Sequence, residues 1–265
     1  MILQKIDFIK RFAAGLLKII VTLAIWDATV IVFRIPNEIL PRAWDVMQVI
    51  IAQLPLFLEH VSYSLFATVI GFLIAAFSGI VLALTFEYVQ LLRKLFYPAL
   101  ISFQSIPKIA LAPIIVIWFG YGIMPKIIMS ALISFFPVFI NTIVGFKSVE
   151  EEMTIYARLL NMNWWQKITK IQLPASAGNI MGGLKIAITF SLIGTIIGEF
   201  AQPDTGLGYL ISVGKEDFKT TFQFAAVALV SFMGWLLYQS IVIIEKTFFS
   251  KYTRYSTIDI QLRYE

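Results

Sequence analysis

Long apolar stretches, each about 20 residues in length, restrict the fold of this chain more than any other feature of its sequence. A helix needs roughly 20 apolar residues to cross a hydrocarbon core about 30 Å thick. Lipid also demands that every backbone polar group be satisfied internally, as it is in a helix. The sequence therefore predicts an all-α membrane protein with six transmembrane helices, at residues 13–33, 63–86, 96–119, 125–146, 180–200 and 222–244.

Composition excludes a soluble protein. Hydrophobic residues make up 59% of the 265 residues and charged residues only 14%, whereas soluble domains carry about 25% charged residues. The sequence contains no cysteine, so disulfides, thiolate metal ligands and a cysteine nucleophile are excluded.

The placement of the basic residues predicts orientation rather than nucleic-acid binding, despite the net charge of +5. Short cytoplasmic loops are enriched in Lys and Arg. Thirteen basic residues fall on one predicted side and five on the other, so we expect both termini to be cytoplasmic. The five on the outer side are Arg34, Arg42, Lys126, Lys215 and Lys219.

One membrane domain accounts for most of the chain, at residues 13–250. Residues 1–12 place isoleucines on one helical face and predict an amphipathic helix in the membrane interface. A cleaved signal peptide is the alternative, which Lys18 and the lack of a small-residue cleavage site disfavour. Residues 251–265 are expected to form a cytoplasmic tail.

The longest predicted cytoplasmic connection, at about residues 150–174, indicates a helical hairpin. Helical spacing covers 153–160 and 163–170, and Asn161 suits the left-handed turn between them. Pro174 predicts a stop before the next span. Trp164 and Trp165 fit either a docking surface for a partner protein or a membrane-interface belt, and the sequence leaves both interpretations open.

The third predicted span contains two prolines, Pro107 and Pro113. Broken helices at membrane depth occur where they line a cavity or are buried in protein. The candidate residues of a translocation pathway are therefore Phe103, Ser105 and Lys108. Two interpretations of Lys108 stay open: a cation inside the membrane that serves the pathway, or a side chain that extends to the membrane interface.

Other polar and small residues predict local contacts. We expect Asp27 to pair with a polar neighbour, Glu199 to lie at the membrane interface, and His60 to form a cap or surface contact outside the second span rather than bind a metal. Lys185 is expected to extend to the cytoplasmic interface. Close helix packing is expected at the pairs Gly178 and Gly182, and Gly194 and Gly198.

One segment resembles the cytoplasmic signature loop of ABC importer permeases, in which E-A-A, three residues, G and nine residues precede I-x-L-P. Ala157 is followed at the family spacing by Ile171, Leu173 and Pro174. Ile155 and Tyr156 replace the Glu and the first Ala, and Asn161 replaces the Gly. Asn keeps the left-handed capability of glycine, so the loop fold is expected to survive.

Further motifs are similar to the nitrate, sulfonate and bicarbonate (taurine-type) branch of this family. They occur in the family order and extend the resemblance over most of the chain. They are His60-Val61-Ser62-Tyr63-Ser64-Leu65, Ser105 to Pro113 with Trp118-Phe119-Gly120, Phe135-Phe136-Pro137 with Asn141-Thr142, and Gly198-Glu199-Phe200 with Gly206-Leu207-Gly208-Tyr209.

The resemblance implies a type I importer permease of the inner (plasma) membrane that works by alternating access. It implies a separate ABC ATPase that binds ATP and Mg²⁺, an extracytoplasmic solute-binding protein, and a permease homodimer in membrane lipid. The residues that it assigns to ATPase coupling are Ala157, Arg158, Leu160, Asn161, Met162, Asn163, Trp164 and Pro174.

The chain lacks the G-x-x-x-x-G-K-[ST] phosphate loop, so we expect it to need no cofactor of its own and no metal. The branch suggests a small anion as substrate, such as nitrate, bicarbonate or a sulfonate. A pyrimidine-like vitamin precursor is the alternative within the same branch. An ion-coupled secondary transporter or a membrane enzyme would require more intramembrane ionisable groups than the sequence offers.

Overall fold

The computed structural model describes residues 21–149 and 151–249, and all regular elements within these residues are helical. The predicted interfacial helix at 1–12 and the tail at 251–265 lie outside the described residues. In chain order the elements are Val21–Val32, α2 (Ala43–Ala52), α3 (Leu54–Tyr88), α4 (Gln90–Gln104), η1 (Lys108–Leu111), α5 (Ala112–Phe119), α6 (Ile123–Lys147), α7 (Glu151–Leu159), α8 (Trp164–Lys167), η2 (Ile168–Gln172), α9 (Leu173–Ala201), α10 (Leu207–Glu216), α11 (Thr220–Ile244) and η3 (Glu245–Phe249).

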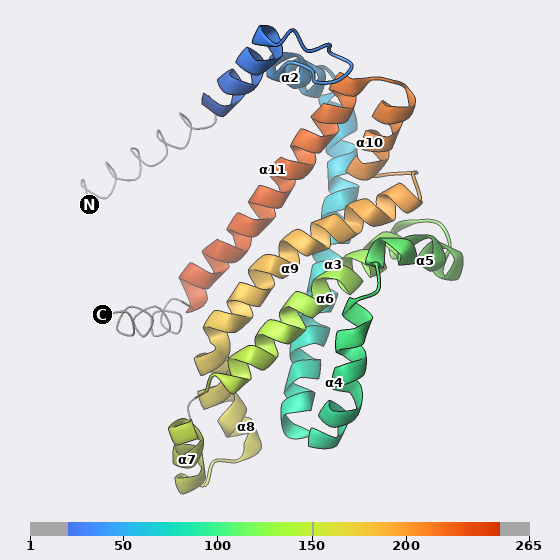
Figure 1. Cartoon of the computed structure of the whole chain (residues 1–265). Helices are drawn as coiled ribbons and strands as arrows, with labels where there is room; N and C mark the ends of the chain where they lie inside the picture. Colours follow the sequence, from blue (N-terminus) through green and yellow to red (C-terminus); the bar gives the residue numbers. More distant parts are fainter. Residues whose placement is uncertain (1–20, 150, 250–265) are drawn as a thin grey trace, which may run out of the picture.

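Four helical stretches within the described residues are long and apolar enough to cross a membrane. They contain the predicted second, fourth, fifth and sixth spans, and they are Leu54–Tyr88, Ile123–Lys147, Trp164–Ala201 and Thr220–Phe248. The predicted first span is described only from residue 21, as the shorter apolar helix Val21–Val32. Figure 1 shows α7 and α8 at one end of the molecule, called here the hairpin end, and α2 and α10 at the opposite end.

The predicted third span is a broken one. Its two halves, Gln90–Gln104 and Lys108–Phe119, meet at an angle of 93°. Pro107 is extended, with φ −62° and ψ 100°, and therefore ends the helical path before η1. Counted as one span, the bent pair brings the total to five, so the expected count of six is not reached in the part of the chain that the structure describes.

Small residues allow α3, α6 and α9 to pack closely at the centre of the molecule (Figure 1). A Cβ added to Gly71 on α3 would lie 2.2 Å from Ser130 Oγ on α6. A Cβ at Gly194 on α9 would lie 2.6 Å from the Met129 carbonyl oxygen. Small residues let helix backbones approach in this way. One face of α3 carries a buried small residue at every fourth position: Ala67, Gly71, Ala75, Gly79 and Ala83.

The glycine-packing prediction is confirmed for one pair and not for the other. Gly194 and Gly198 both contact α6, with an added Cβ at Gly198 only 2.9 Å from Lys126 Cα. An added Cβ at Gly182, in contrast, would meet no described atom within 4 Å. That side of α9 is open in the single chain.

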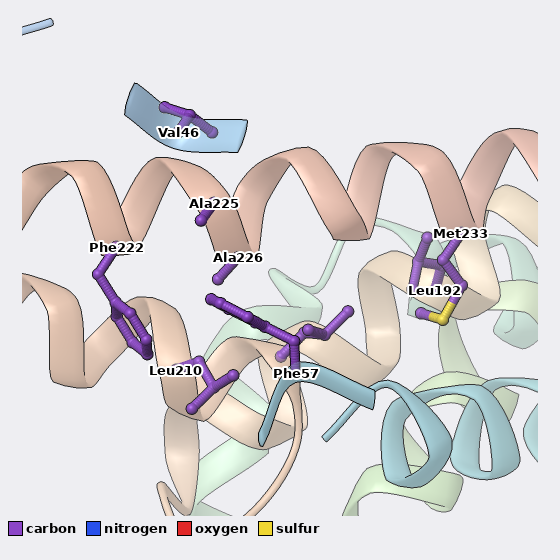
Figure 2. Packing of buried hydrophobic residues seen from close by; sticks show 9 residues of the cluster. Val46, Phe57, Leu192, Leu210, Phe222, Ala225, Ala226 and Met233 are labelled. Atoms are coloured by element: carbon purple, nitrogen blue, oxygen red, sulfur yellow. The ribbon is translucent and has the colours of Figure 1, made fainter. Parts of the chain in front are cut away.

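A second core lies at the end opposite the hairpin, where α2, α3, α10 and α11 meet. Figure 2 shows Phe57 of α3 between Leu210 of α10 and the small residues Ala225 and Ala226 of α11. The Phe57 ring lies 5.2 Å from that of Phe222, centroid to centroid. Burial of these apolar side chains holds the short helix α10 against the long spans.

The predicted stop at Pro174 is wrong. The chain is helical without interruption from Trp164 to Ala201, a stretch of 38 residues. Pro174 lies in the first turn of α9, and a π-helical turn, η2, precedes it. In the interior of a helix a proline removes one backbone hydrogen bond and its ring crowds the carbonyl of the preceding turn. The wider π turn changes the hydrogen-bond ladder just before Pro174 and accommodates the proline there. The second helix of the hairpin is therefore continuous with a membrane span.

Candidate functional site

The predicted hairpin is present, with α7 and α8 joined by a turn at Asn161. Asn161 has φ 49°, the left-handed conformation predicted for it. Asn163 and Gln166 form a reciprocal capping box, in which Gln166 N donates to Asn163 Oδ1 over 2.8 Å and Asn163 N donates to Gln166 Oε1 over 3.1 Å. The turn and the cap together fix the angle at which α8 leaves the turn.

The hairpin presents large apolar side chains to its surroundings. Leu160 is 66% exposed, Trp164 64% and Trp165 59%. Ala157 is buried, so it packs within the hairpin. Met162 and Pro174 are half-buried, and the side chain of Arg158 lies outside the described ones. An exposed Leu and Trp cluster of this kind suits a protein interface.

One residue of α3, Tyr88, joins the hairpin to the start of α4. Its hydroxyl donates a hydrogen bond to Gln172 Oε1 in η2, and its ring meets that of Trp164 edge-on, with centroids 6.3 Å apart. α3 ends at Tyr88, and α4 begins two residues later at Gln90. Sequence reasoning missed Tyr88 because it lies about 80 residues from the hairpin and carries no motif.

An open groove of about 500 Å³ lies between the first half of the broken span and the central helices. One wall comes from α4 and η1, and the other from α6 and α9. Its polar side chains are Gln104 and Lys108 on the first wall and Asn141 on the second. The apolar and aromatic lining residues are Tyr97, Ile101, Ile133, Phe136, Pro137, Ile140, Ile186 and Phe190.

Lys108 is the charged group of this groove. Its ammonium lies 3.3 Å from the Gln104 carbonyl oxygen and 5.3 Å from the centroid of the Phe136 ring. It makes no ion pair with any described residue. A carbonyl and an aromatic face stabilise the cation without neutralising it, so Lys108 can still attract an anion.

The structure separates the three pathway candidates. Lys108 lines the groove, whereas the ring of Phe103 stacks on Phe136 at 6.1 Å. Ser105 is exposed at the end of α4 and is not among the described lining residues. Gln104 and Asn141 were missed as pathway residues. Asn141 lay within a quoted motif, but nothing in the sequence placed it opposite Lys108.

At the end opposite the hairpin, three buried side chains bind the first backbone amides of α10. Gly206 N donates to His60 Nδ1 at 2.9 Å, and Leu207 N donates to Ser64 Oγ at 2.8 Å. Gly208 N donates to Glu199 Oε2 at 2.6 Å. These free N–H groups at a helix start need acceptors when they are buried. Glu199 is fully buried under α10, and its expected depth at the membrane interface stays a prediction.

The capping role expected for His60 is confirmed by its contact with Gly206 N. His60 lies on α3, six residues after the helix begins at Leu54, and its position outside the membrane span stays a prediction. His60 and Ser64 are four residues apart and so share one helix face. Two motifs thus meet at the start of α10, one with His60 and Ser64 and the other with Glu199, although Ser64 and Glu199 are 135 residues apart in the sequence.

Lys126 was expected in an outer loop, but it lies in the first turn of α6 and is only 2% exposed. Its ammonium contacts Asp204 Oδ1 at 2.5 Å, and it also donates to Thr205 Oγ1 at 2.7 Å. Partial burial alone would raise the pKa of Asp204, but the hydrogen bond and charge of Lys126 hold that pKa below its ordinary value. The pair anchors the loop between α9 and α10 onto α6.

Asp27 and Lys185 each have a partner in the fold. Asp27 Oδ1 accepts a hydrogen bond from Ala43 N at 2.7 Å, so it caps α2 and has the polar neighbour expected for it. Lys185 of α9 forms an ion pair with Glu245 of η3 at 2.5 Å. The pair supplies a partner for Lys185 that the sequence interpretation did not anticipate.

The comparisons with known proteins agree with this architecture. The sequence profile of the family described as "Binding-protein-dependent transport system inner membrane component" matches residues 67–254. A protein of Haemophilus influenzae, named as a probable ABC transporter permease, is 30% identical over 87% of this chain and 94% of its own length.

Two other relatives have names that include a substrate. The aliphatic sulfonates transport permease SsuC of Bacillus subtilis is 28% identical over 71% of this chain and 68% of its own length. The formylaminopyrimidine transport permease ThiX of Halalkalibacterium halodurans is 30% identical over 83% of this chain and 88% of its own length.

Matches to permeases named for taurine and nitrate transport agree with the branch inferred from the motifs. The extent of the profile match, the apolar spans and these relatives give one conclusion about the chain's identity. This chain belongs to the family of inner membrane components of binding-protein-dependent transport systems, and it is a multi-pass ABC transporter permease of the nitrate, sulfonate and taurine branch.

Proposed function

We propose that this permease imports a small anion, such as a sulfonate, nitrate or bicarbonate, through the groove between α4 and α9. The observation that carries the proposal is the position of Lys108, a cation in the break of a membrane span without an ion-pair partner among the described residues. An ionisable group at such a position is costly unless it serves a ligand or a pathway. Gln104 and Asn141 add hydrogen-bonding groups on opposite walls.

Energy for transport would come from a separate ABC ATPase that binds ATP and Mg²⁺ and docks on the hairpin of α7 and α8. The exposed Leu160 and Trp164 support this docking site. In this arrangement the hairpin end faces the cytoplasm and both termini lie there. An extracytoplasmic solute-binding protein would deliver the anion to the opposite end, as the family description implies.

A second copy of the chain would complete the pathway as a homodimer. Two features support this. The groove is open on one side, and within the described residues no side chain of α4 is buried. Coverage by a second copy would turn an open groove into an enclosed passage, which alternating access requires.

The aromatic lining favours a second candidate substrate, a pyrimidine-like vitamin precursor. Tyr97, Phe136 and Phe190 line the groove, and aromatic rings stack on planar heterocycles with offset or edge-on geometry. The relative named for formylaminopyrimidine transport supports this alternative. The two candidates differ in whether the cation or the rings of the groove select the substrate.

The proposal is tested by purifying the chain from native membranes in mild detergent and identifying the proteins that remain bound by mass spectrometry. We expect an ABC ATPase and a solute-binding protein. Calorimetry on that binding protein with taurine, nitrate, bicarbonate and formylaminopyrimidine would then identify the substrate class. Repeated recovery of the chain without an ATPase, across several detergents, would refute the ATP-driven mechanism.

Two matched variants test the docking site. Leu160→Asp places a charge on the hairpin, and Ile39→Asp places one at the opposite end, on a side chain of nearly equal exposure, 67% against 66%. The first should remove the ATPase from the purified complex, and the second should not. If Leu160→Asp retains the ATPase as well as the parent chain does, the docking surface lies elsewhere.

A further inference from the structure

We propose that Tyr88 is the positioning residue through which the hairpin moves one wall of the transport groove relative to the other. The inference rests on the proposed function, since it takes the hairpin as the ATPase-docking element. It concerns the connection from that element to the groove, for which the geometry of α3, α4 and η2 gives a physical route.

The groove has two walls that are connected to the hairpin in different ways. In the wall formed by α6 and α9, Ile186 and Phe190 of α9 belong to the same uninterrupted helix as α8, from Trp164 to Ala201. Motion of the hairpin reaches this wall through the backbone itself. The other wall, formed by α4 and η1, is separate in sequence and needs a side-chain contact to follow the hairpin.

Tyr88 supplies that contact from two sides. Its hydroxyl donates to Gln172 Oε1 in η2, and its ring meets Trp164 at the start of α8. Gln172 is 3% exposed, and a buried amide oxygen that loses its hydrogen-bond donor destabilises the fold. Trp164 has one edge on Tyr88 and is 64% exposed, so it remains accessible to a docked protein.

The chain beyond Tyr88 leads directly to the groove. Val89 breaks the helix with φ −111° and ψ 83°, and α4 starts at Gln90. α4 then carries Tyr97, Ile101 and Gln104 along the groove. α4 contacts the core only through partly buried side chains, Leu92, Tyr97 and Leu100, and none of its described side chains is fully buried. Moving α4 therefore disturbs fewer packed contacts than moving α6 or α9 would. A shift at Tyr88 should therefore change the width of the groove near Lys108.

The π turn places Gln172 for this contact. η2 spans Ile168–Gln172, immediately before the first turn of α9. π turns within α-helices occur often at functional sites. The π turn lies where the hairpin, α3 and α9 meet. It therefore has a role in this contact besides accommodating Pro174.

The test measures how accessible the groove is to a labelling reagent, in the complex of this chain purified with its ATPase. The chain has no cysteine, so Ile101→Cys gives one labelling site in the groove. Labelling by a membrane-impermeant maleimide is measured without nucleotide and after trapping with ATP and vanadate. Tyr88→Ala or Tyr88→Phe is then added to this parent. The control is Tyr63→Ala, because Tyr63 is another α3 tyrosine and is 41% exposed, against 39% for Tyr88.

Tyr88→Ala should reduce the nucleotide-dependent change in labelling by roughly 2- to 30-fold, the range expected for residues that carry coupling between sites. Bound ATPase and ATP hydrolysis should remain, since the docking surface and the ATPase are intact. Tyr88→Phe keeps the ring contact but loses the hydrogen bond, so it should fall between. Tyr63→Ala should behave as the Ile101→Cys parent. A role confined to stability would lower the melting temperature without this graded loss.

The outcomes separate the two hypotheses. If Tyr88→Ala shows the same nucleotide response as its parent, the inference about Tyr88 is overturned and the ATP-driven mechanism is unaffected. If the Ile101→Cys parent itself shows no response to ATP, or no ATPase binds, the proposed function fails and this inference fails with it. A double-variant cycle of Tyr88→Phe and Gln172→Leu should be non-additive, because the two side chains share one hydrogen bond.

Discussion

Ser64 on α3 donates a hydrogen bond to Glu199 on α9 over 2.6 Å, and each of the two also binds a backbone amide at the start of α10. Their positions are separated by 135 residues in the sequence. The bond therefore connects three elements at one point. Both side chains are fully buried, so the connection depends on complete pairing of its polar groups.

Replacing Glu199 by Leu should destabilise the protein by about 1–3 kcal/mol for each buried partner left without its hydrogen bond. Gly208 N and Ser64 Oγ would both lose an acceptor. Thermal unfolding followed by tryptophan fluorescence in detergent measures the effect. Glu216→Leu, at the exposed end of α10, is the control and should leave the transition nearly unchanged. An equal shift in both variants would contradict a structural role for the buried carboxylate.

The Lys126–Asp204 pair should make the stability of this end depend on acid. Lys126 lowers the pKa of Asp204 in the folded protein, so the pair contributes stability above the ordinary Asp value of about 3.9. That contribution is lost as pH falls through the still lower folded pKa. The melting temperature of Asp204→Asn should therefore vary less than that of the parent below about pH 4.

The control for this pH series is Asp217→Asn, which changes an exposed carboxylate paired with Lys219 at 2.9 Å. Its pH profile should follow that of the parent. Parallel profiles for Asp204→Asn and the parent chain would show that the Lys126 contact contributes nothing to acid sensitivity.

Lys108→Met should reduce uptake of an anionic substrate by about tenfold or more, since a hydrogen bond to a charged group contributes about 1.5–3 kcal/mol. Lys108→Arg keeps the charge and should retain most of the activity. Lys215→Met removes an exposed cation of α10 and serves as control. Unchanged uptake kinetics in Lys108→Met would favour the alternative, in which this side chain extends to the membrane interface.

Asn161→Val should uncouple ATP hydrolysis from transport. The φ of 49° at this position costs a β-branched residue about 1–3 kcal/mol, and relief of that strain would change the angle between α7 and α8. Asn161→Gly accepts the same conformation and should remain coupled. The measurement is substrate transported per ATP hydrolysed in proteoliposomes, and normal coupling in the valine variant would remove the role assigned to the turn.

Two glycines of α9 should respond oppositely to the same change. Gly194→Ala forces a Cβ to within 2.6 Å of the Met129 carbonyl oxygen, so α6 and α9 must move apart and the melting temperature should fall. Gly182→Ala meets no described atom within 4 Å and should keep or slightly raise it, because alanine favours helix by about 1 kcal/mol over glycine. Equal destabilisation would show that Gly182 is packed against a second chain.

Local chemistry predicted much of this fold because it acts over a few residues. Apolar length identified the helices at α3, α6, α9 and α11, and Pro107 identified the broken span. The left-handed conformation of Asn161 followed from its short polar side chain. The prediction for Pro174 failed because a π turn just before the proline lets the helix continue through it, and the sequence does not reveal a π turn.

Relationships between distant residues were not predictable from one sequence. The motifs that contain His60, Ser64 and Glu199 were visible separately, but their common contact with α10 depends on how the helices cross. Lys126 was counted among the outer-loop cations in the prediction of orientation, whereas the fold buries it with Asp204 and Thr205 as its partners. Lys108 was identified from its place in the break, but not Asn141 on the facing wall.

The uninterrupted helix from Trp164 to Ala201 has a thermodynamic consequence for the two ends of the molecule. Its 38 residues extend over about 57 Å, from the hairpin to the neighbourhood of Glu199. A ligand that favours one position of this helix at either end changes affinity at the other end by the same factor, because linkage is reciprocal. Nucleotide state should thus alter how tightly the solute-binding protein is held, and the bound solute-binding protein should alter nucleotide affinity equally.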